Sequence, residues 1–338
     1  MKITLSDTER ICKDIYQKGF DLELLFSGNA NSERIFGVDM KEFRQDKMTA
    51  FSRAVTRFNE DFFIPEDMDV HVLRQPRYMP VKDHCHDFIE FIYVYQGSCT
   101  QHINGAEVEA EEGDLFLLSP GIYHHIAAYD DDIIVLYVMI RVTTFATAFL
   151  SLLKQDDILS EFFAHVLYSG NKHPYLLFFT KGDKALKEWI YDMYLEAVGK
   201  DRYSDRMLNT QLEWMCLHLL RNHVINMELY GHKGKAVRIM EFLDYISENA
   251  SGITLSSMAR HFGYSASYLS RMIKDMTGRN FKDIVLRARL ERACELLKNN
   301  SISVGAVAES VGFCDASNFH KAFKKQLQMT PSEYRKSL

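Results

Sequence analysis

The spacing of hydrophobic and polar residues changes from one part of the chain to the next. Short runs rich in Val, Ile, Tyr and Phe fill residues 66–142, among them Phe88–Tyr95 and Ile133–Ile140. Turn sequences such as Asn104-Gly105 separate these runs. Many short strands at this spacing predict a β-sandwich or barrel.

The other parts of the chain favour helices. Residues 143–229 have helical periodicity, and residues 237–338 have helical periodicity throughout. Residues 230–236 have the composition of a linker, and residues 1–65 mix short helical patterns with polar turns and receive no function. The pattern therefore predicts a multidomain α+β protein, with a β-barrel and flanking helices before an all-α C-terminal domain.

Charge divides the chain in the same place. The 338 residues carry a net charge of −6, which by itself argues against a nucleic-acid partner. Residues 233–338, however, hold 17 Lys and Arg against 10 Asp and Glu, a net charge of +7. Residues 1–232 then hold 23 basic and 36 acidic residues, a net charge of −13. Such asymmetry indicates a basic nucleic-acid-binding module joined to another domain.

Three features indicate the compartment. The first residues are polar and acidic from Ser6 onward, without the apolar core of a signal peptide. The most apolar stretch, Ile133–Ile140, is far shorter than the ~20 residues of a membrane span. The 6 cysteines show no CxxC pairing. We therefore expect a cytoplasmic protein with reduced thiols and no membrane partner.

A sequence pattern occurs twice in the basic part. Met258–Tyr264 followed by Ser267–Lys274 corresponds to Val307–Phe313 followed by Ser317–Lys324, at an offset of 49 and then 50 residues. Each copy has the features of a helix-turn-helix: a small residue for close helix packing, a glycine that ends the first helix, and a cap for the second. These residues are Ala259, Gly263 and Ser265 in the first copy and Ala308, Gly312 and Asp315 in the second.

The second helix of each copy, which we call the recognition helix, has one apolar and one polar face. At about 100° per residue, small polar residues and cations gather opposite the apolar stripe, as contacts to bases and phosphates require. A helix over 281–298 would be about 27 Å long and could place both recognition helices in successive major grooves. The expected DNA contacts are Ser265, Ser267, Tyr268, Arg271, Lys274, Asp315, Ser317, Asn318, His320, Lys321, Lys324 and Lys325.

Residues from about Val237 to Leu338 resemble the double helix-turn-helix domain of AraC/XylS-type transcription regulators. The family ending appears as Gly312-Phe313, Ser317, Phe319, Phe323-Lys324-Lys325, Thr330-Pro331 and Tyr334-Arg335. Gln328 departs from it, because the family usually has Gly there, whereas the first copy keeps Gly278. The resemblance implies a double-stranded DNA operator, a small-molecule effector, contact with RNA polymerase, and a homodimer formed through the helices of 143–229.

The strand-rich part contains the spacing H-x-H-x₃-E-x₆-G at His84, His86, Glu90 and Gly97, and later His124-His125. This resembles the two cupin motifs, and cupin-like barrels are the usual sensors of AraC-type regulators. Because side chains alternate along a strand, His84, His86 and Glu90 should face the same way. We expect a polar ligand, such as a carbohydrate, at His84, His86, Glu90, His124 and Tyr93.

Two alternatives use the same histidines. His84, His86, Glu90 and His124 are candidate ligands for Fe, Mn, Ni or Zn, and a metal-dependent cupin enzyme with an added DNA-binding domain is the second hypothesis. The cluster could also be a hydrogen-bonded polar group with no ligand. Because the DNA-binding part decides the role of the molecule, we expect a regulator and not an enzyme, with no metal and no cofactor.

Overall fold

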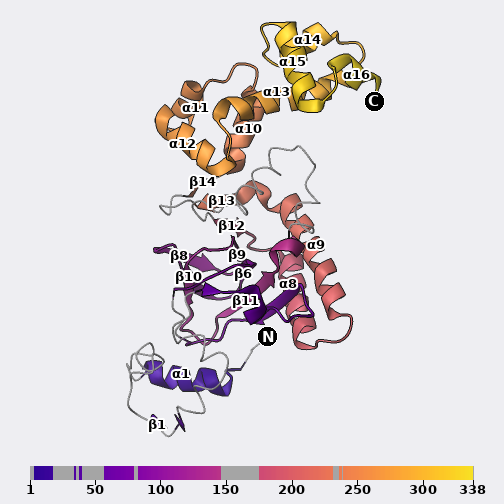
Figure 1. Cartoon of the computed structure of the whole chain (residues 1–338). Coiled ribbons are helices and arrows are strands. Elements are labelled where there is room, and N and C mark those ends of the chain that lie inside the picture. Colours follow the sequence, from indigo (N-terminus) through magenta and orange to yellow (C-terminus); the bar gives the residue numbers. More distant parts are fainter. Residues whose placement is uncertain are drawn as a thin grey trace. The chain divides into compact units, whose positions relative to one another are not determined.

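The structure, a computed structural model, describes residues 4–17, 34–35, 38–39, 57–79, 83–145, 175–230, 236–237 and 239–337. The described residues form two compact units, the first of which ends at Val237 and the second of which begins at Ile239. The first is built on β-sheets and the second on helices, so the predicted α+β architecture is confirmed (Figure 1). No helix in the described ranges is long and apolar enough to cross a membrane.

Two antiparallel sheets make up most of the first unit. The larger has the strand order β14-β13-β12-β9-β6-β11-β4, and the smaller has the order β10-β7-β8. Buried residues of both sheets, such as Phe116 and Ile126, belong to one core cluster between them. The strands are β4 (Val70–Arg74), β6 (Ile89–Gln96), β7 (Ser98–Ile103), β8 (Ala106–Glu111), β9 (Asp114–Leu118), β10 (His124–Ala127), β11 (Ile134–Ile140), β12 (Tyr175–Phe179), β13 (Met227–Tyr230) and β14 (Ala236–Val237).

The sheet extends beyond the predicted boundary at residue 142. Strand β12 pairs with β9, and β13 pairs with β12, although residues 143–229 were predicted to be helical. Short apolar runs such as β12 cannot be distinguished from buried helix by periodicity alone. Helices α8 (Lys184–Val198) and α9 (Ser204–Asn222) do lie between these strands in the sequence, side by side on one flank of the unit (Figure 1).

The predicted linker 230–236 begins and ends in paired strands, because Tyr230 of β13 lies opposite Ala236 of β14. Its two glycines, Gly231 and Gly234, lie outside the described residues.

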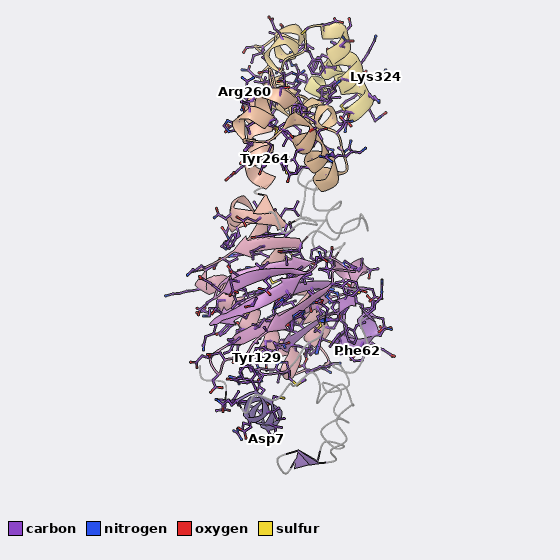
Figure 2. All side chains as sticks on the ribbon, turned by 90° about the vertical axis from the view of Figure 1, so that its left-hand side faces the viewer. Asp7, Phe62, Tyr129, Arg260, Tyr264 and Lys324 are labelled. Atoms are coloured by element: carbon purple, nitrogen blue, oxygen red, sulfur yellow. The ribbon has the colours of Figure 1, made fainter. Side chains whose placement is uncertain are left out.

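Part of the unassigned N-terminal segment packs on the first unit. Helix α1 (Asp7–Gln17) inserts Glu9, which is completely buried and pairs with Arg74 at 2.7 Å and Arg77 at 3.0 Å. Burial raises the pKa of Glu9, but these hydrogen bonds outweigh it and hold that pKa far below its usual range. Figure 2 shows α1, labelled at Asp7, beside Tyr129, whose ring stacks on Tyr16 at 4.7 Å.

The remaining described elements before β4 are short. Strand β1 (Arg34–Ile35) pairs with β2 (Val38–Asp39), and β3 (Arg57–Phe58) runs parallel to β5 (Cys85–His86). Helix α5 (Glu60–Phe63) follows β3 and brings Phe63 close to Phe88, with ring centroids 6.0 Å apart. Residues 57–63 of the segment 1–65 therefore contribute directly to the barrel.

The second unit contains the predicted pair of helix-turn-helices joined by one long helix. The connecting helix, predicted over 281–298, covers 17 residues, which corresponds to about 25 Å. A core cluster that includes Val307, Phe319 and Phe323 packs the second helix-turn-helix against this helix. The helices are α10 (Ile239–Asn249), α11 (Leu255–His261), α12 (Ala266–Thr277), α13 (Phe281–Leu297), α14 (Val304–Ser310), α15 (Ala316–Leu327) and α16 (Pro331–Lys336).

Candidate functional site

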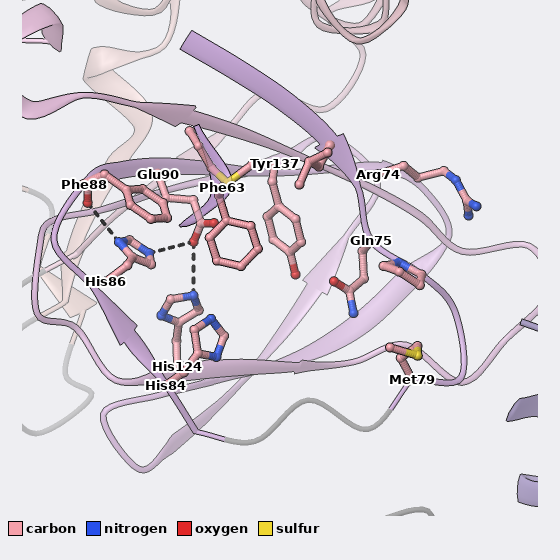
Figure 3. A pocket seen from close by; sticks show the side chains of 13 residues that line it. Phe63, Arg74, Gln75, Met79, His84, His86, Phe88, Glu90, His124 and Tyr137 are labelled. Atoms are coloured by element: carbon pink, nitrogen blue, oxygen red, sulfur yellow. Dashed lines mark hydrogen bonds and ion pairs between the residues drawn. The ribbon is translucent and has the colours of Figure 1, made fainter. Parts of the chain in front are cut away.

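The structure brings His84, His86, Glu90 and His124 together in the barrel, although His86 ends β5 and Glu90 belongs to the next strand, β6 (Figure 3). Glu90 lies at the centre, with its Oε2 atom 3.1 Å from Nε2 of His86 and 3.1 Å from Nε2 of His124. His84 completes the group, its ring centroid 4.4 Å from that of His124. All four side chains are buried, so their polar atoms are largely withdrawn from water.

Backbone carbonyls fix the orientation of two of these histidines. Nδ1 of His86 donates to the carbonyl of Phe88 at 2.9 Å, and Nδ1 of His124 donates to the carbonyl of Ile122 at 3.1 Å. Each Nε2 atom is thereby turned towards Glu90. Burial raises the pKa of the Glu90 carboxyl, but the charge and hydrogen bonds of His86 and His124 hold it well below its usual range. The site therefore presents a buried carboxylate between two imidazoles.

These groups line a pocket to which several residues not predicted from the sequence also contribute. Its empty space, including the part open to solvent, is about 580 Å³. Phe63, Phe88 and Tyr137 provide aromatic walls, and Gln75 projects towards the same space (Figure 3). Within the part of the chain that the structure describes, the buried Nε2 atom of Gln75 has no hydrogen-bond partner. The remaining lining residues are Leu73, Arg74, Pro76, Met79 and Met139.

Tyr93, which the sequence grouped with the ligand-binding residues, does not line this pocket. It is three residues from Glu90 on β6, so the alternation of side chains places it on the opposite face of the strand. Its ring lies near Tyr95, at 6.5 Å between centroids, and its hydroxyl is hydrogen-bonded to Thr180. His125 also faces away from its neighbour His124 and pairs with Asp83 at 2.6 Å.

The helical unit contains a second candidate site, formed by recognition helices α12 and α15. The predicted caps are present: Ser265 accepts a hydrogen bond from the backbone of Tyr268, and Asp315 accepts one from that of Ser317. Gly263 and Gly312 have positive φ angles of 70° and 88°, as the turns of both copies require.

The polar faces of both recognition helices are accessible. Leu269 and Ile273 of α12, and Phe319 and Phe323 of α15, are buried, which fixes the opposite faces outward. Figure 2 labels Lys324, whose side chain extends from α15. Of the predicted DNA contacts, only Tyr268 and His320 are half-buried. The exposed ones are Ser265, Ser267, Arg271, Lys274, Asp315, Ser317, Asn318, Lys321, Lys324 and Lys325.

Direct contacts tie the two helix-turn-helices together. Arg289 of α13 donates to the carbonyls of Ala250 at 2.7 Å and Ser251 at 3.1 Å, in the turn before α11. The same guanidinium lies 5.8 Å from the ring centroid of Phe313, which follows α14. A hydrogen-bonded, packed junction of this kind holds the two recognition helices at a defined spacing.

Gln328, the departure from the family pattern, ends α15 in the left-handed conformation with φ of 58°. Gly278 ends α12 in the same way, with φ of 70°. A left-handed residue other than Gly costs roughly 1–2 kcal/mol, partly offset here by the hydrogen bond from Gln328 Nε2 to the Lys325 carbonyl at 3.0 Å.

Gln328→Gly is therefore expected to stabilise the protein by about 0.5–1 kcal/mol, without changing DNA affinity. Denaturant unfolding followed by circular dichroism measures the first effect, and a DNA titration measures the second. A loss of stability would mean that the side-chain hydrogen bond outweighs the backbone strain.

Two protein-family models match the chain, one in the N-terminal part and one in the C-terminal part. A model of AraC-like ligand binding domains matches residues 69–158. A model of helix-turn-helix domains matches residues 258–337. The first match covers the pocket-forming strands from β4 to β11, and the second covers both recognition helices.

Several known transcription regulators are similar to the chain. The Msm operon regulatory protein of Streptococcus mutans is 24% identical over 250 residues, 74% of this chain and 84% of the relative. The uncharacterized regulator YijO of Escherichia coli is 38% identical over 143 residues, 42% of this chain and 49% of the relative. The arabinose operon regulatory protein of Escherichia coli is 29% identical over 163 residues, 46% of this chain and 54% of the relative.

The matches thus join a ligand-binding domain to a DNA-binding domain in one chain, and the similarity to an operon regulator extends over most of both proteins. The chain is a DNA-binding transcription regulator that belongs to the AraC/XylS family.

Proposed function

We propose that this regulator changes its affinity for an operator when a small polar ligand, a carbohydrate, binds in the pocket around Glu90. The observation that carries the proposal is the Nε2 atom of Gln75, which has no hydrogen-bond partner among the described residues and is buried in the wall of the same pocket as Glu90. A buried donor without a partner is costly, at about 1–3 kcal/mol, and a ligand oxygen would remove this cost.

The chemistry of the pocket suits a sugar. Its hydroxyl groups can both donate to the Glu90 carboxylate and accept from Gln75, while the ring faces of Phe63 and Tyr137 can pack against its C–H groups. The arabinose operon regulator among the relatives supports the same ligand class. To act as a signal, the ligand must bind more tightly to one arrangement of the chain than to another.

We further propose that the protein acts as a homodimer formed through α8 and α9. These helices leave several large apolar side chains exposed, which is the kind of surface that association covers. They are Leu195 and Val198 of α8 and Met207 and Leu217 of α9. A dimer would present two helical units to an operator. RNA polymerase is the further partner that we propose from the family.

The test of the pocket compares two adjacent histidines in the full chain. A screen of neutral mono- and disaccharides by thermal shift first identifies a ligand. His124→Ala is then expected to abolish the effect of that sugar on DNA affinity, while DNA affinity without sugar stays within about twofold. His125→Ala is the matched control, because its side chain faces away from the pocket and pairs with Asp83. An unchanged response of the His124→Ala variant would place the ligand elsewhere.

A metal-dependent enzyme is the second candidate function, and one observation favours it. His86, Glu90 and His124 place potential ligand atoms within 4.8 Å of one another, and both histidines donate Nδ1–H to a carbonyl, as metal-binding histidines do. Elemental analysis of the wild type and the Glu90→Gln variant, with a DNA mobility shift, separates the two functions. A stoichiometric metal that depends on Glu90, without DNA binding, would favour the enzyme.

A further inference from the structure

A second group of potential metal ligands lies outside the pocket, where α8, α9 and the segment before β13 meet. Nε2 of His218 and Nε2 of His223 each lie 2.6 Å from the same oxygen, Oδ2 of Asp183. Their side chains are 18%, 13% and 15% exposed, respectively, so the group is sheltered but open to solvent on one side. None of the three lines the pocket around Glu90.

We propose that Asp183, His218 and His223 form a binding site for a divalent transition-metal ion, with Zn²⁺ as the preferred ion. Two imidazole nitrogens and one carboxylate oxygen are a common set of protein ligands for Zn²⁺. Three protein ligands leave a fourth position of the tetrahedron for water on the exposed side. On binding, Zn²⁺ takes the place of the two contacts between Nε2 and Oδ2, and each neutral imidazole then carries its one proton on Nδ1.

The geometry allows this with little movement. The potential ligand atoms lie within 4.8 Å of one another. Ligand atoms bound to Zn²⁺ at about 2.0–2.1 Å are about 3.3 Å apart in a tetrahedron, so the two separations of 2.6 Å need to lengthen by less than 1 Å. Rotation of the two imidazole side chains about their own bonds can provide that change.

Each ligand is also held by its surroundings, as a preformed site requires. The other carboxylate oxygen of Asp183, Oδ1, caps α8 by accepting from the backbone of Leu186 at 3.0 Å. The ring of His218 stacks on Trp214 at 4.6 Å, and Trp214 stacks on Trp189 at 4.1 Å. His223 ends α9, with its backbone N–H bonded to the Leu219 carbonyl at 2.9 Å. The ion would therefore join the start of α8 to the end of α9.

The two tryptophans provide a direct probe, because they are the only ones in the chain and both belong to this stack. Co²⁺, which is paramagnetic, should quench their fluorescence when it occupies the site of the full-length, chelator-treated protein. Quenching is expected to saturate at one equivalent and to be reversed by Zn²⁺, which generally binds such sites more tightly than Co²⁺. Elemental analysis after Zn²⁺ loading gives the stoichiometry.

Asp183→Asn is the most informative variant. Its remaining oxygen can still cap α8, whereas an amide nitrogen replaces the oxygen that faces both histidines. Substitution of a residue that only hydrogen-bonds to a metal ligand weakens metal binding about 10–100-fold. Substitution of a ligand itself should weaken it further, so Asp183→Asn and His223→Ala should each bind Co²⁺ at least about 100-fold more weakly than the wild type. Unchanged circular dichroism would show that the variants remain folded.

Two controls distinguish this site from other histidines. His125→Ala removes another imidazole that is hydrogen-bonded to a single carboxylate, that of Asp83, and should leave quenching unchanged. Glu90→Gln removes one of the three potential metal ligands of the pocket, and it should also leave the Co²⁺ quenching unchanged. The proposal is overturned if Co²⁺ causes no saturable quenching, if Asp183→Asn and His223→Ala bind as well as the wild type, or if only Glu90→Gln loses the ion.

Discussion

Replacing Gly312 with alanine is expected to destabilise the helical unit by about 2–5 kcal/mol. An alanine Cβ at this position would lie 2.1 Å from the Ser251 carbonyl oxygen and 2.6 Å from its Cα atom. Both atoms belong to backbone, so no side chain can rotate away to relieve the clash. The φ angle of 88° adds the strain of a left-handed alanine.

The first copy of the repeat provides a matched control. Gly263 occupies the corresponding turn, with φ of 70°, but an added Cβ would meet nothing within 4 Å. Gly263→Ala should therefore cost only the backbone strain, about 1–2 kcal/mol. The difference between the two variants isolates the contact of Gly312 with the turn that contains Ser251.

This difference can be measured by denaturant unfolding of the full chain. Circular dichroism at a helix-sensitive wavelength is the suitable signal, because both tryptophans lie in the first unit and do not report on the second. Gly312→Ala should also weaken DNA binding more than Gly263→Ala does, since it separates two helix-turn-helices that Arg289 and Gly312 hold together. Equal losses of stability in the two variants would contradict the packing described here.

The helix-turn-helices could be predicted almost completely from the sequence because their determinants are local. A cap such as Ser265 acts within three residues, and Gly263 acts on the turn directly before it. The duplication added a second, independent copy of each signal. The junction through Arg289 and Ser251 had no such signal, because these residues are 38 positions apart and meet only after folding.

The pocket could be predicted only in part, for the same physical reason. The histidines and Glu90 follow from short motifs in the sequence, although they lie on separate strands and not on the single strand that was assumed for His84, His86 and Glu90. Applied to Tyr93, the alternation of side chains along a strand would already have placed it on the other face of β6, so this error was avoidable. Gln75 and Phe63 come from different elements, and no spacing in the sequence connects them with Glu90.

Strands β12 and β13 were missed because strand pairing is not local. Tyr175 pairs with Leu118, on a strand far earlier in the sequence, and an apolar run of five residues fits a buried helix equally well. Only the neighbouring strand decides between the two.

The affinity of the full chain for duplex DNA is expected to fall about 40-fold between 50 and 200 mM salt. Five exposed cations lie on the recognition helices: Arg271, Lys274, Lys321, Lys324 and Lys325. If Lys274, Lys324 and Lys325 each contact one phosphate, counterion release gives a slope of about −2.7 in log affinity against log salt, and hence this loss over a fourfold change in salt. Fluorescence anisotropy with the DNA upstream of the gene measures the slope.

Single substitutions then show what each cation binds. Lys324→Ala should make the slope shallower by about 0.9 and weaken binding to all sequences alike, as expected for a side chain that binds a phosphate. Arg271 and Lys321 lie nearer the N-terminal ends of their helices, where base edges are read. Arg271→Ala and Lys321→Ala should each cost about 1–3 kcal/mol of binding free energy on the operator alone, if the side chain hydrogen-bonds a base. Footprinting should then show two protected major grooves about one turn apart for each monomer.

Lys298→Ala is the matched control for these variants. Lys298 belongs to the same unit and is exposed, but it lies outside both recognition helices and its charge is paired with Glu295 at 2.8 Å. Its removal should change the slope by much less than 0.9, because a cation that is already neutralised and distant from the DNA releases no counterion. If Lys298→Ala and Lys324→Ala changed the slope equally, the salt dependence would come from the general charge of the unit, and α15 would not be the DNA-contacting helix proposed here.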